Sequence, residues 1–138
     1  DRHAARNRIQ ALCFELDAPA MVRLLVARGG ASALETRPLP LPLGEPVKVA
    51  ALPCPLDPSD WRLAHKTSDR GFYEDALAAA RTLGAMEAVL VRADGLLTEG
   101  SFTCVFAEGS DGVLITPPAH LGLLPGVLRA HLLAEGRA

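Results

Sequence analysis

Lys66 is the first residue whose type and position could support chemistry. It follows a proline-rich segment and precedes a predicted helix, in the run His65-Lys66-Thr67. A lysine amine in a protected position can attack a carbonyl group and can also move protons. The same position fits a solvated lysine at the start of a helix, so the residue alone does not decide between the two.

Two further features could take part in a site with Lys66. Glu99 is the only acidic residue between Asp94 and Glu108, and it ends a predicted hairpin strand. Pro125-Gly126 leads into a predicted helix, whose first backbone amides could bind a phosphate group. Taken alone, each also has a structural interpretation, as a turn residue and as an ordinary start of a helix.

Two helices are predicted close to these residues. The apolar spacing predicts a helix over 69–83 with Ala76, Ala79 and Ala80 on one face, ended by Gly84. A second helix is expected over 127–134.

Four short strands are predicted in the same part of the chain, at 88–92, 96–98, 102–107 and 113–116. The Asp-Gly pair between the first two is a strong signal for a hairpin turn. Two hairpins in succession predict an antiparallel sheet.

The first part of the chain, residues 2–58, has a different pattern of predicted elements. Apolar residues at helical spacing predict an amphipathic helix over 2–14. Two strands, 21–27 and 31–36, are expected to form a hairpin across a Gly-Gly pair. The segment 37–58 contains seven prolines around a strand-like run at 47–52, which proline confines to an edge strand or a linker.

The composition narrows the class of protein. The chain has 138 residues, of which 49% are hydrophobic and 22% are charged, as in a globular core. No apolar stretch reads as a spanning helix and no secretory leader opens the chain, so we expect a soluble, cytoplasmic protein without a membrane partner. The net charge of -2, with both signs mixed along the chain, argues against a nucleic-acid partner.

Cysteine and histidine residues do not form a metal-ligand pattern. Cys13, Cys54 and Cys104 are widely spaced, and we expect each to be a small buried hydrophobic residue. The four histidines form no ligand-spaced pair, so no metal is expected. Among the basic residues only Lys48 and Lys66 are lysines.

The order of the motifs resembles that of the fold-type IV pyridoxal 5′-phosphate enzymes, the class IV aminotransferase family. The matching runs are HKT, DGLLTEGSFTCVF, DGVLITPP and GLLPGVLRAHLL, within Leu63 to Leu133. His3-Ala4-Ala5-Arg6 is similar to the HxxR helix of that family. The resemblance implies a mixed α+β, two-domain fold like that of D-amino-acid aminotransferase.

The resemblance also implies a role for each site residue. Lys66 would bind the aldehyde of pyridoxal 5′-phosphate covalently and move protons at the substrate carbon, and is the expected catalytic residue. Glu99 would contact the pyridine nitrogen of the cofactor. The backbone amides of Val127 and Leu128 would hold its phosphate, and Arg6 would reach that phosphate from the other domain. Family members are usually homodimers that act on small-molecule substrates.

Three residues point to a subgroup of the family or depart from its pattern. Arg70, four residues after the lysine, resembles the pattern of 4-amino-4-deoxychorismate lyase, including the lyase-like domain fused to aminodeoxychorismate synthase. Gly71 stands where branched-chain aminotransferases carry a tyrosine, and Tyr73 is nearby but is expected to face differently. Cys104 stands where the family usually has an asparagine that fixes the turn after the glutamate.

A lyase that forms 4-aminobenzoate and pyruvate for folate synthesis is therefore the first hypothesis. An aminotransferase acting on a D- or branched-chain amino acid is the alternative, and a non-catalytic remnant is the second alternative. Relative to the family, we expect an incomplete chain, with the remainder of the small N-terminal domain and a linker at 1–58. The cofactor-binding domain is expected at 59–138.

Overall fold

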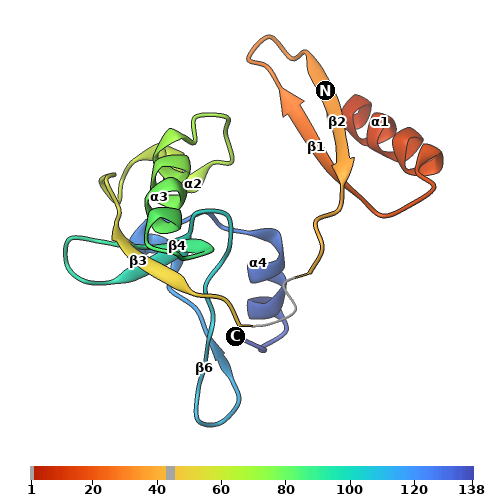
Figure 1. Cartoon of the computed structure of the whole chain (residues 1–138). Coiled ribbons are helices and arrows are strands. Elements are labelled where there is room, and N and C mark those ends of the chain that lie inside the picture. Colours follow the sequence, from red (N-terminus) through yellow and green to blue (C-terminus); the bar gives the residue numbers. More distant parts are fainter. Residues whose placement is uncertain (1, 43–45) are drawn as a thin grey trace. The chain divides into compact units, whose positions relative to one another are not determined.

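The computed structural model describes residues 2–42 and 46–138, and it divides into two compact units, Asp1–Gly44 and Glu45–Ala138. Figure 1 shows the chain coloured along its sequence. The boundary expected at 58/59 between the domains of the complete fold stays a prediction. In this structure the residues just before it, Val49–Pro53, form a strand of the second unit.

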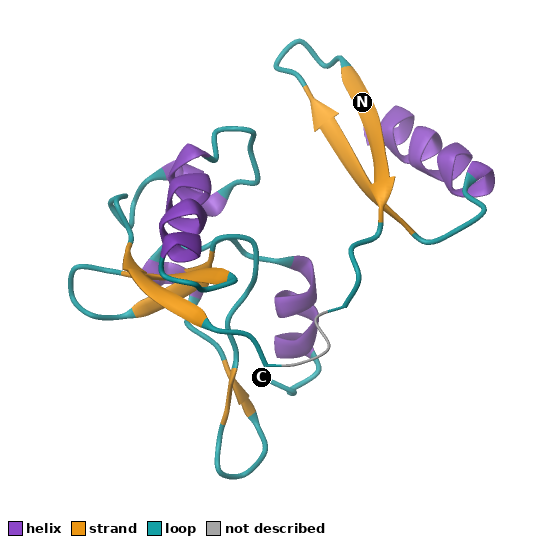
Figure 2. Cartoon of the chain, viewed as in Figure 1, coloured by secondary structure: helices purple, strands orange, loops and turns teal. Residues whose placement is uncertain are grey.

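The first unit consists of helix α1 (Arg2–Glu15) and a hairpin of strands β1 (Ala20–Val26) and β2 (Ser32–Pro38). The two strands pair antiparallel from Ala20 opposite Pro38 to Val26 opposite Ser32, which confirms the predicted hairpin. Figure 2 shows α1 beside this hairpin. Arg8 of α1 donates to the backbone oxygen of Ser32 over 2.6 Å and to its hydroxyl over 2.8 Å, so a polar contact joins helix and hairpin.

The helix α1 confirms the predicted periodicity, with one correction. Ala5, Ile9 and Leu12 are half-buried, as expected for its apolar face. Cys13, however, is exposed, so the prediction that it is buried is wrong. A position next to Leu12 lies about 100° further around the helix, which turns this thiol away from the hairpin.

The second unit is built around a three-stranded sheet. Its elements in chain order are β3 (Val49–Pro53), α2 (Trp61–Ala64), α3 (Gly71–Thr82), β4 (Glu87–Val91), β5 (Leu97–Gly100), β6 (Ala107–Glu108), β7 (Leu114–Ile115), a 3₁₀ turn (Ala119–Leu121) and α4 (Val127–Ala134). The three-stranded sheet has the order β3-β4-β5, and β6 pairs with β7 in a separate hairpin.

The sheet is mixed, which corrects the prediction of an antiparallel sheet. β3 runs parallel to β4, whereas β4 and β5 form the predicted antiparallel hairpin. The parallel pair arises because the connection from β3 to β4 passes through α3, and such a crossover returns the chain in the same direction. β3 lies at an edge of the sheet, in agreement with the prolines in and around it.

The core lies between α3 and the sheet. Its buried residues are Ala50, Tyr73, Ala76, Ala80, Ala85, Ala88 and Leu90. Tyr73, Ala76 and Ala80 are three and four residues apart, so they share one face of α3. Ala79 is exposed, which corrects the prediction that it belongs to this face.

The predicted strand 102–107 is shorter in the structure, where only Ala107–Glu108 pair with Leu114–Ile115. After β5 the chain turns, and the backbone N–H of Gly100 donates to the carbonyl of Thr103 over 2.9 Å. This bond closes a tight turn, and the chain therefore leaves the sheet before residue 102.

The other two cysteines also differ from expectation. Cys54 is half-buried and Cys104 is exposed, so neither is the fully buried hydrophobic residue that was predicted. Within the described parts of the chain, no helix has the length and apolar character needed to span a membrane.

Candidate functional site

Lys66 lies on the loop between α2 and α3 and is exposed. It lines a pocket in the second unit together with Arg62, His65, Thr67, Asp69, Arg70, Tyr73 and Leu124. The pocket therefore combines a primary amine with two guanidinium groups. They come from α2, from the loop of residues 65–70 between α2 and α3 (the lysine loop), from the start of α3 and from the segment before α4.

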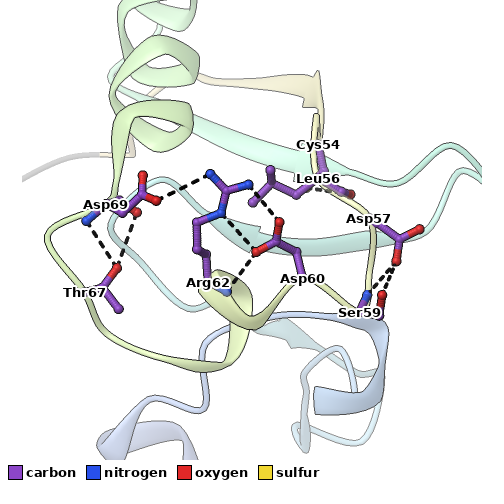
Figure 3. A network of polar contacts seen from close by, with 8 residues as sticks. All are labelled: Cys54, Leu56, Asp57, Ser59, Asp60, Arg62, Thr67 and Asp69. Carbon is purple, nitrogen blue, oxygen red and sulfur yellow. Dashed lines mark hydrogen bonds and ion pairs between the residues drawn. The ribbon is translucent and has the colours of Figure 1, made fainter.

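Arg62 of α2 contacts one carboxylate before this helix, that of Asp60, and one at the far end of the lysine loop, that of Asp69, as Figure 3 shows. The Nε and Nη2 atoms of Arg62 donate to the two carboxylate oxygens of Asp60 over 3.0 and 2.7 Å. Its Nη1 atom lies 3.6 Å from the carboxylate of Asp69, on the far side of Lys66. Asp60 also caps α2 by accepting from the backbone N–H of Arg62. One side chain thus connects the helix before Lys66 with the residues after it.

The opposite charges of Asp60 and Arg62 stabilise each other. Hydrogen bonds from Arg62, supported by its positive charge, lower the pKa of Asp60 to about 2. The same carboxylate raises the pKa of Arg62. Both groups therefore stay charged at neutral pH. On the other side of Lys66, the hydroxyl of Thr67 accepts from the backbone N–H of Asp69 over 3.2 Å and closes the turn into α3.

Glu99 lies on β5 next to two residues of the pocket wall, and only 5% of its surface is exposed. Its Oε1 atom accepts a hydrogen bond of 2.5 Å from the hydroxyl of Tyr73. The backbone N–H of Leu124 donates to both carboxylate oxygens at 3.2 Å. Tyr73 and Leu124 both line the pocket, so they connect this buried carboxylate to the wall that also carries Lys66.

Burial and hydrogen bonding act in opposite directions on Glu99. Burial raises its pKa, while the hydrogen bonds from Tyr73 and Leu124 and the positive charges of Arg70 and Lys66 oppose the rise. Burial also raises the pKa of Tyr73, and the hydrogen bond to Glu99 and the negative charge there raise it further. Tyr73 therefore remains a proton donor to the carboxylate.

Arg70 completes this side of the pocket. Its guanidinium carbon lies 4.9 Å from the centre of the Tyr73 ring, and its Nη2 atom donates to the carbonyl of Ser101 over 2.9 Å. Stacking and hydrogen bonding together restrict the guanidinium. The positive charge is thus fixed between the lysine loop and the turn after Glu99.

The sequence did not reveal the contact between Tyr73 and Glu99. Tyr73 was expected to face differently from the tyrosine that branched-chain aminotransferases carry at the position of Gly71. Its contact with Glu99 was not foreseen. One signal for it was present, because Tyr73 shares the helical face of Ala76 and Ala80. A tyrosine on a buried face usually finds an acceptor for its hydroxyl group.

The expected phosphate-binding residues lie at the start of α4. Gly126 precedes the helix in an extended conformation, and the residues Val127 and Leu128 are 88% and 67% exposed. The first amides of a helix have no partner within it and are available to an anion. A Cβ atom at Gly126 would lie 2.8 Å from the sulfur of Cys104, so glycine permits the close approach of these two segments.

Arg129 attaches α4 to the rest of the second unit. It is buried, and its Nε and Nη2 atoms donate to the hydroxyl of Thr116 over 3.2 Å and to the carbonyl of Pro117 over 2.7 Å. The helix start is therefore fixed relative to the segment that follows β7.

Arg6 belongs to the other unit. It is exposed on α1 and lines a shallow groove along this helix with Arg2, Ala5, Ile9 and Gln10. The structure thus brings together Lys66 and the surroundings of Glu99. The role of Arg6 at a phosphate group, like the roles of Val127 and Leu128, stays a prediction.

The comparisons with other proteins agree on one family. The family described as amino-transferase class IV matches residues 1–138. No functionally curated protein matches the chain. A solved structure of a proposed amino-acid aminotransferase from Mesorhizobium loti is 36% identical, with a TM-score of 0.89, over 100% of this chain and 67% of that one.

Two further solved structures are similar over most of this chain. A proposed 4-amino-4-deoxychorismate lyase is 29% identical, with a TM-score of 0.79, over 99% of this chain and 56% of that one. A hypothetical aminotransferase from Mycobacterium tuberculosis in its PLP-bound form has a TM-score of 0.77, over 96% of this chain and 52% of that one. At 22% identity, the second likeness shows the fold alone.

The chain therefore spans between about half and two thirds of the length of these structures. The match over the full chain and the 36% identity confirm the resemblance seen in the sequence, including the mixed helix-and-sheet fold. The chain belongs to the class IV aminotransferase family, whose members are pyridoxal 5′-phosphate enzymes.

Proposed function

We propose that this protein binds pyridoxal 5′-phosphate in the pocket of Lys66 and uses Lys66 as its catalytic residue. The observation that carries the proposal is the convergence of three groups in the second unit. The amine of Lys66 and the guanidinium of Arg70 line one pocket, and the carboxylate of Glu99 lies directly behind Tyr73 and Leu124.

The residues of the second unit offer the chemical groups that such a cofactor needs. An aldehyde needs a primary amine, which Lys66 supplies. A pyridine nitrogen needs a buried acceptor, and Glu99 still has acceptor capacity on Oε2 after its bonds with Tyr73 and Leu124. A phosphate needs unpaired amides or cations, and the helix start at Val127 and Leu128 offers amides.

When bound, the cofactor accepts electrons from the substrate carbon into its ring. Lys66 would hold the cofactor and move a proton at that carbon. Glu99 would keep the ring nitrogen protonated, and Tyr73 would orient Glu99 through its hydrogen bond. Arg70 adds a fixed positive charge, suited to an anionic substrate group.

The reaction that we propose is that of a 4-amino-4-deoxychorismate lyase. Lys66 would remove the proton from the ring carbon that bears the amine. The bond between the neighbouring ring carbon and the enolpyruvyl oxygen would then break, so that the ring becomes aromatic. The enolate of pyruvate leaves and takes up a proton to give pyruvate. Arg70, four residues after the lysine, and Gly71 in place of a tyrosine support this reaction, and so does the likeness to a proposed lyase at 29% identity.

An aminotransferase is the second candidate, because the structure from Mesorhizobium loti at 36% identity is described as an amino-acid aminotransferase. Lys66 and Glu99 would serve either reaction. We further propose that the protein is homodimeric, as the family resemblance implies, and cytoplasmic, as its composition predicts.

Incubation with 4-amino-4-deoxychorismate separates the candidates. Release of 4-aminobenzoate together with pyruvate is expected for the lyase. Absence of both products, with turnover of an amino acid and a keto acid, would support the aminotransferase instead. Absence of every turnover and of visible absorbance after addition of pyridoxal 5′-phosphate would identify a non-catalytic remnant. A Lys66→Ala variant serves as the control in each assay.

A further inference from the structure

Glu87 is a second buried carboxylate beside the candidate site, and the proposed reaction does not use it. It is the first residue of β4, and only 6% of its surface is exposed. Its Oε1 atom accepts from the backbone N–H of Ala88 over 2.8 Å. The same atom accepts from the N–H and the hydroxyl of Ser101 over 3.0 and 2.5 Å. Its Oε2 atom accepts from the hydroxyl of Thr103 over 2.9 Å.

The donors to Glu87 are concentrated in the turn that directly follows Glu99. Three of its four hydrogen bonds come from Ser101 and Thr103. Burying a carboxylate is costly unless hydrogen bonds replace the lost water. The turn supplies these bonds, and the carboxylate in return fixes the turn.

Gly100 shows how closely the turn approaches Glu87. A Cβ atom built on Gly100 would lie 2.1 Å from the hydroxyl oxygen of Thr103 and 3.0 Å from Oε2 of Glu87. Only a residue without a side chain leaves room for this arrangement. The backbone immediately after Glu99 is therefore packed against the second carboxylate.

The turn also connects Glu87 with Arg70. Ser101 gives its N–H and hydroxyl to Glu87 and accepts from Arg70 at its carbonyl over 2.9 Å. Arg70 in turn stacks on Tyr73, whose hydroxyl binds Glu99. A continuous set of contacts thus runs from Glu87 to both charged groups beside Lys66.

We propose that Glu87 is a positioning residue, which fixes the Gly100–Thr103 turn and thereby holds Glu99 and Arg70 in the geometry needed for cofactor binding. Glu87 acts through Ser101 and Thr103 and does not itself contact the cofactor. This inference rests on the proposed cofactor site. A shift of a supporting group by a small distance is enough to weaken a site of this kind.

The test compares Glu87→Ala with Glu87→Gln and with the matched control Thr98→Val. Thr98 is buried in the same sheet, and its hydroxyl donates to the carbonyl of Leu90, away from the turn. Glutamine keeps one oxygen for the Ser101 donors, and its amide can donate to the Thr103 hydroxyl. Cofactor affinity is measured by titration of the cofactor-free protein with pyridoxal 5′-phosphate. Order in the turn is measured by amide hydrogen exchange without the cofactor.

We expect Glu87→Ala to weaken cofactor binding about tenfold or more and to accelerate exchange in the peptide over 99–104. Glu87→Gln should restore most of both properties, and Thr98→Val should change neither by more than about twofold. If Glu87→Ala does not fold, the double variant Ser101→Ala/Thr103→Val removes the two hydroxyl donors and is expected to show the same two effects.

Equal cofactor affinity in the turn variants and in Thr98→Val would overturn the role of Glu87. So would exchange that accelerates equally throughout the unit, because that result indicates a general loss of stability. Failure of the unsubstituted protein to bind pyridoxal 5′-phosphate would instead contradict the proposed function. Accelerated exchange confined to the turn would then still show that Glu87 fixes it.

Discussion

The hydroxyl of Tyr73 donates a 2.5 Å hydrogen bond to Oε1 of Glu99, across 26 residues of sequence. This bond joins the buried face of α3 to the end of β5. It orients the carboxylate that we place at the cofactor's ring nitrogen. The tyrosine also forms part of the core, so fold stability and site geometry depend on the same side chain.

Removing only the hydroxyl tests this relationship. Tyr73→Phe keeps the aromatic ring in the core and below Arg70 but removes the donor to Glu99. A hydrogen bond to a charged group contributes about 1.5–3 kcal/mol, so the free energy of unfolding should fall by roughly that amount. Urea unfolding of the cofactor-free protein measures it. An unchanged free energy would show that the bond does not stabilise the fold.

The pKa of Glu99 predicts a pH dependence of stability. Because burial raises this pKa above 4.5, the folded state holds the proton more tightly than the unfolded state. The contribution of Glu99 to stability is therefore fully present below pH 4.5 and is lost as the pH rises through the folded-state value. Glu99→Gln does not titrate and removes this dependence.

We expect unfolding free energies at pH 4.5 and pH 7.5 to show the difference directly. From pH 4.5 to pH 7.5, the free energy of unfolding of the unsubstituted protein should fall relative to that of Glu99→Gln. A difference that stays constant, or that changes in the opposite direction, would contradict the raised pKa. In the catalytic assay, Glu99→Gln should lower turnover by about a hundredfold or more.

Acid should loosen the lysine loop through Asp60. Its pKa of about 2 lies below the ordinary value of 3.8, so its stabilising pair with Arg62 is present above pH 3.8. That contribution is lost as the pH falls through about 2. Arg62→Ala removes the pair at every pH and should accelerate amide exchange in the peptide over 62–69.

Arg81→Ala is the matched control, because Arg81 is an exposed arginine in the last turn of α3. It should leave exchange in the loop unchanged. Ion pairs that remain partly accessible to water contribute little to global stability, so both variants should unfold at nearly the same urea concentration. Equal exchange in the loop of both variants would show that Arg62 does not hold it.

The sequence predicted the local elements well because local patterns specify them. Helix α1, the β1–β2 hairpin and the helix α3 follow from apolar spacing and from glycine turns. The parallel pairing of β3 with β4 could not be read in the same way. The periodicity of a strand shows which side chains share a face but not which strand lies next to it.

The site was predictable in part for the same reason. Lys66 and Glu99 stand in recognisable runs, and in the structure Tyr73 and Leu124 line the pocket of Lys66 and also donate to Glu99. The shortened strand after Glu99 was not predicted, because the turn depends on Glu87, more than ten residues earlier. Contacts between distant side chains decide such details, and no local pattern records them.

The proposed function depends most directly on the identity of the lysine that binds the cofactor. The chain has two lysines, and Lys48 donates to the carbonyl of Leu83 over 2.9 Å, away from the pocket residues. Lys48 therefore provides an internal control. The measurement is peptide mass spectrometry after incubation with pyridoxal 5′-phosphate and reduction with borohydride. We predict a phosphopyridoxyl group on the peptide carrying Lys66, retained in Lys48→Ala and lost in Lys66→Ala. Labelling of Lys48 in preference to Lys66, or of neither lysine, would contradict the proposed function.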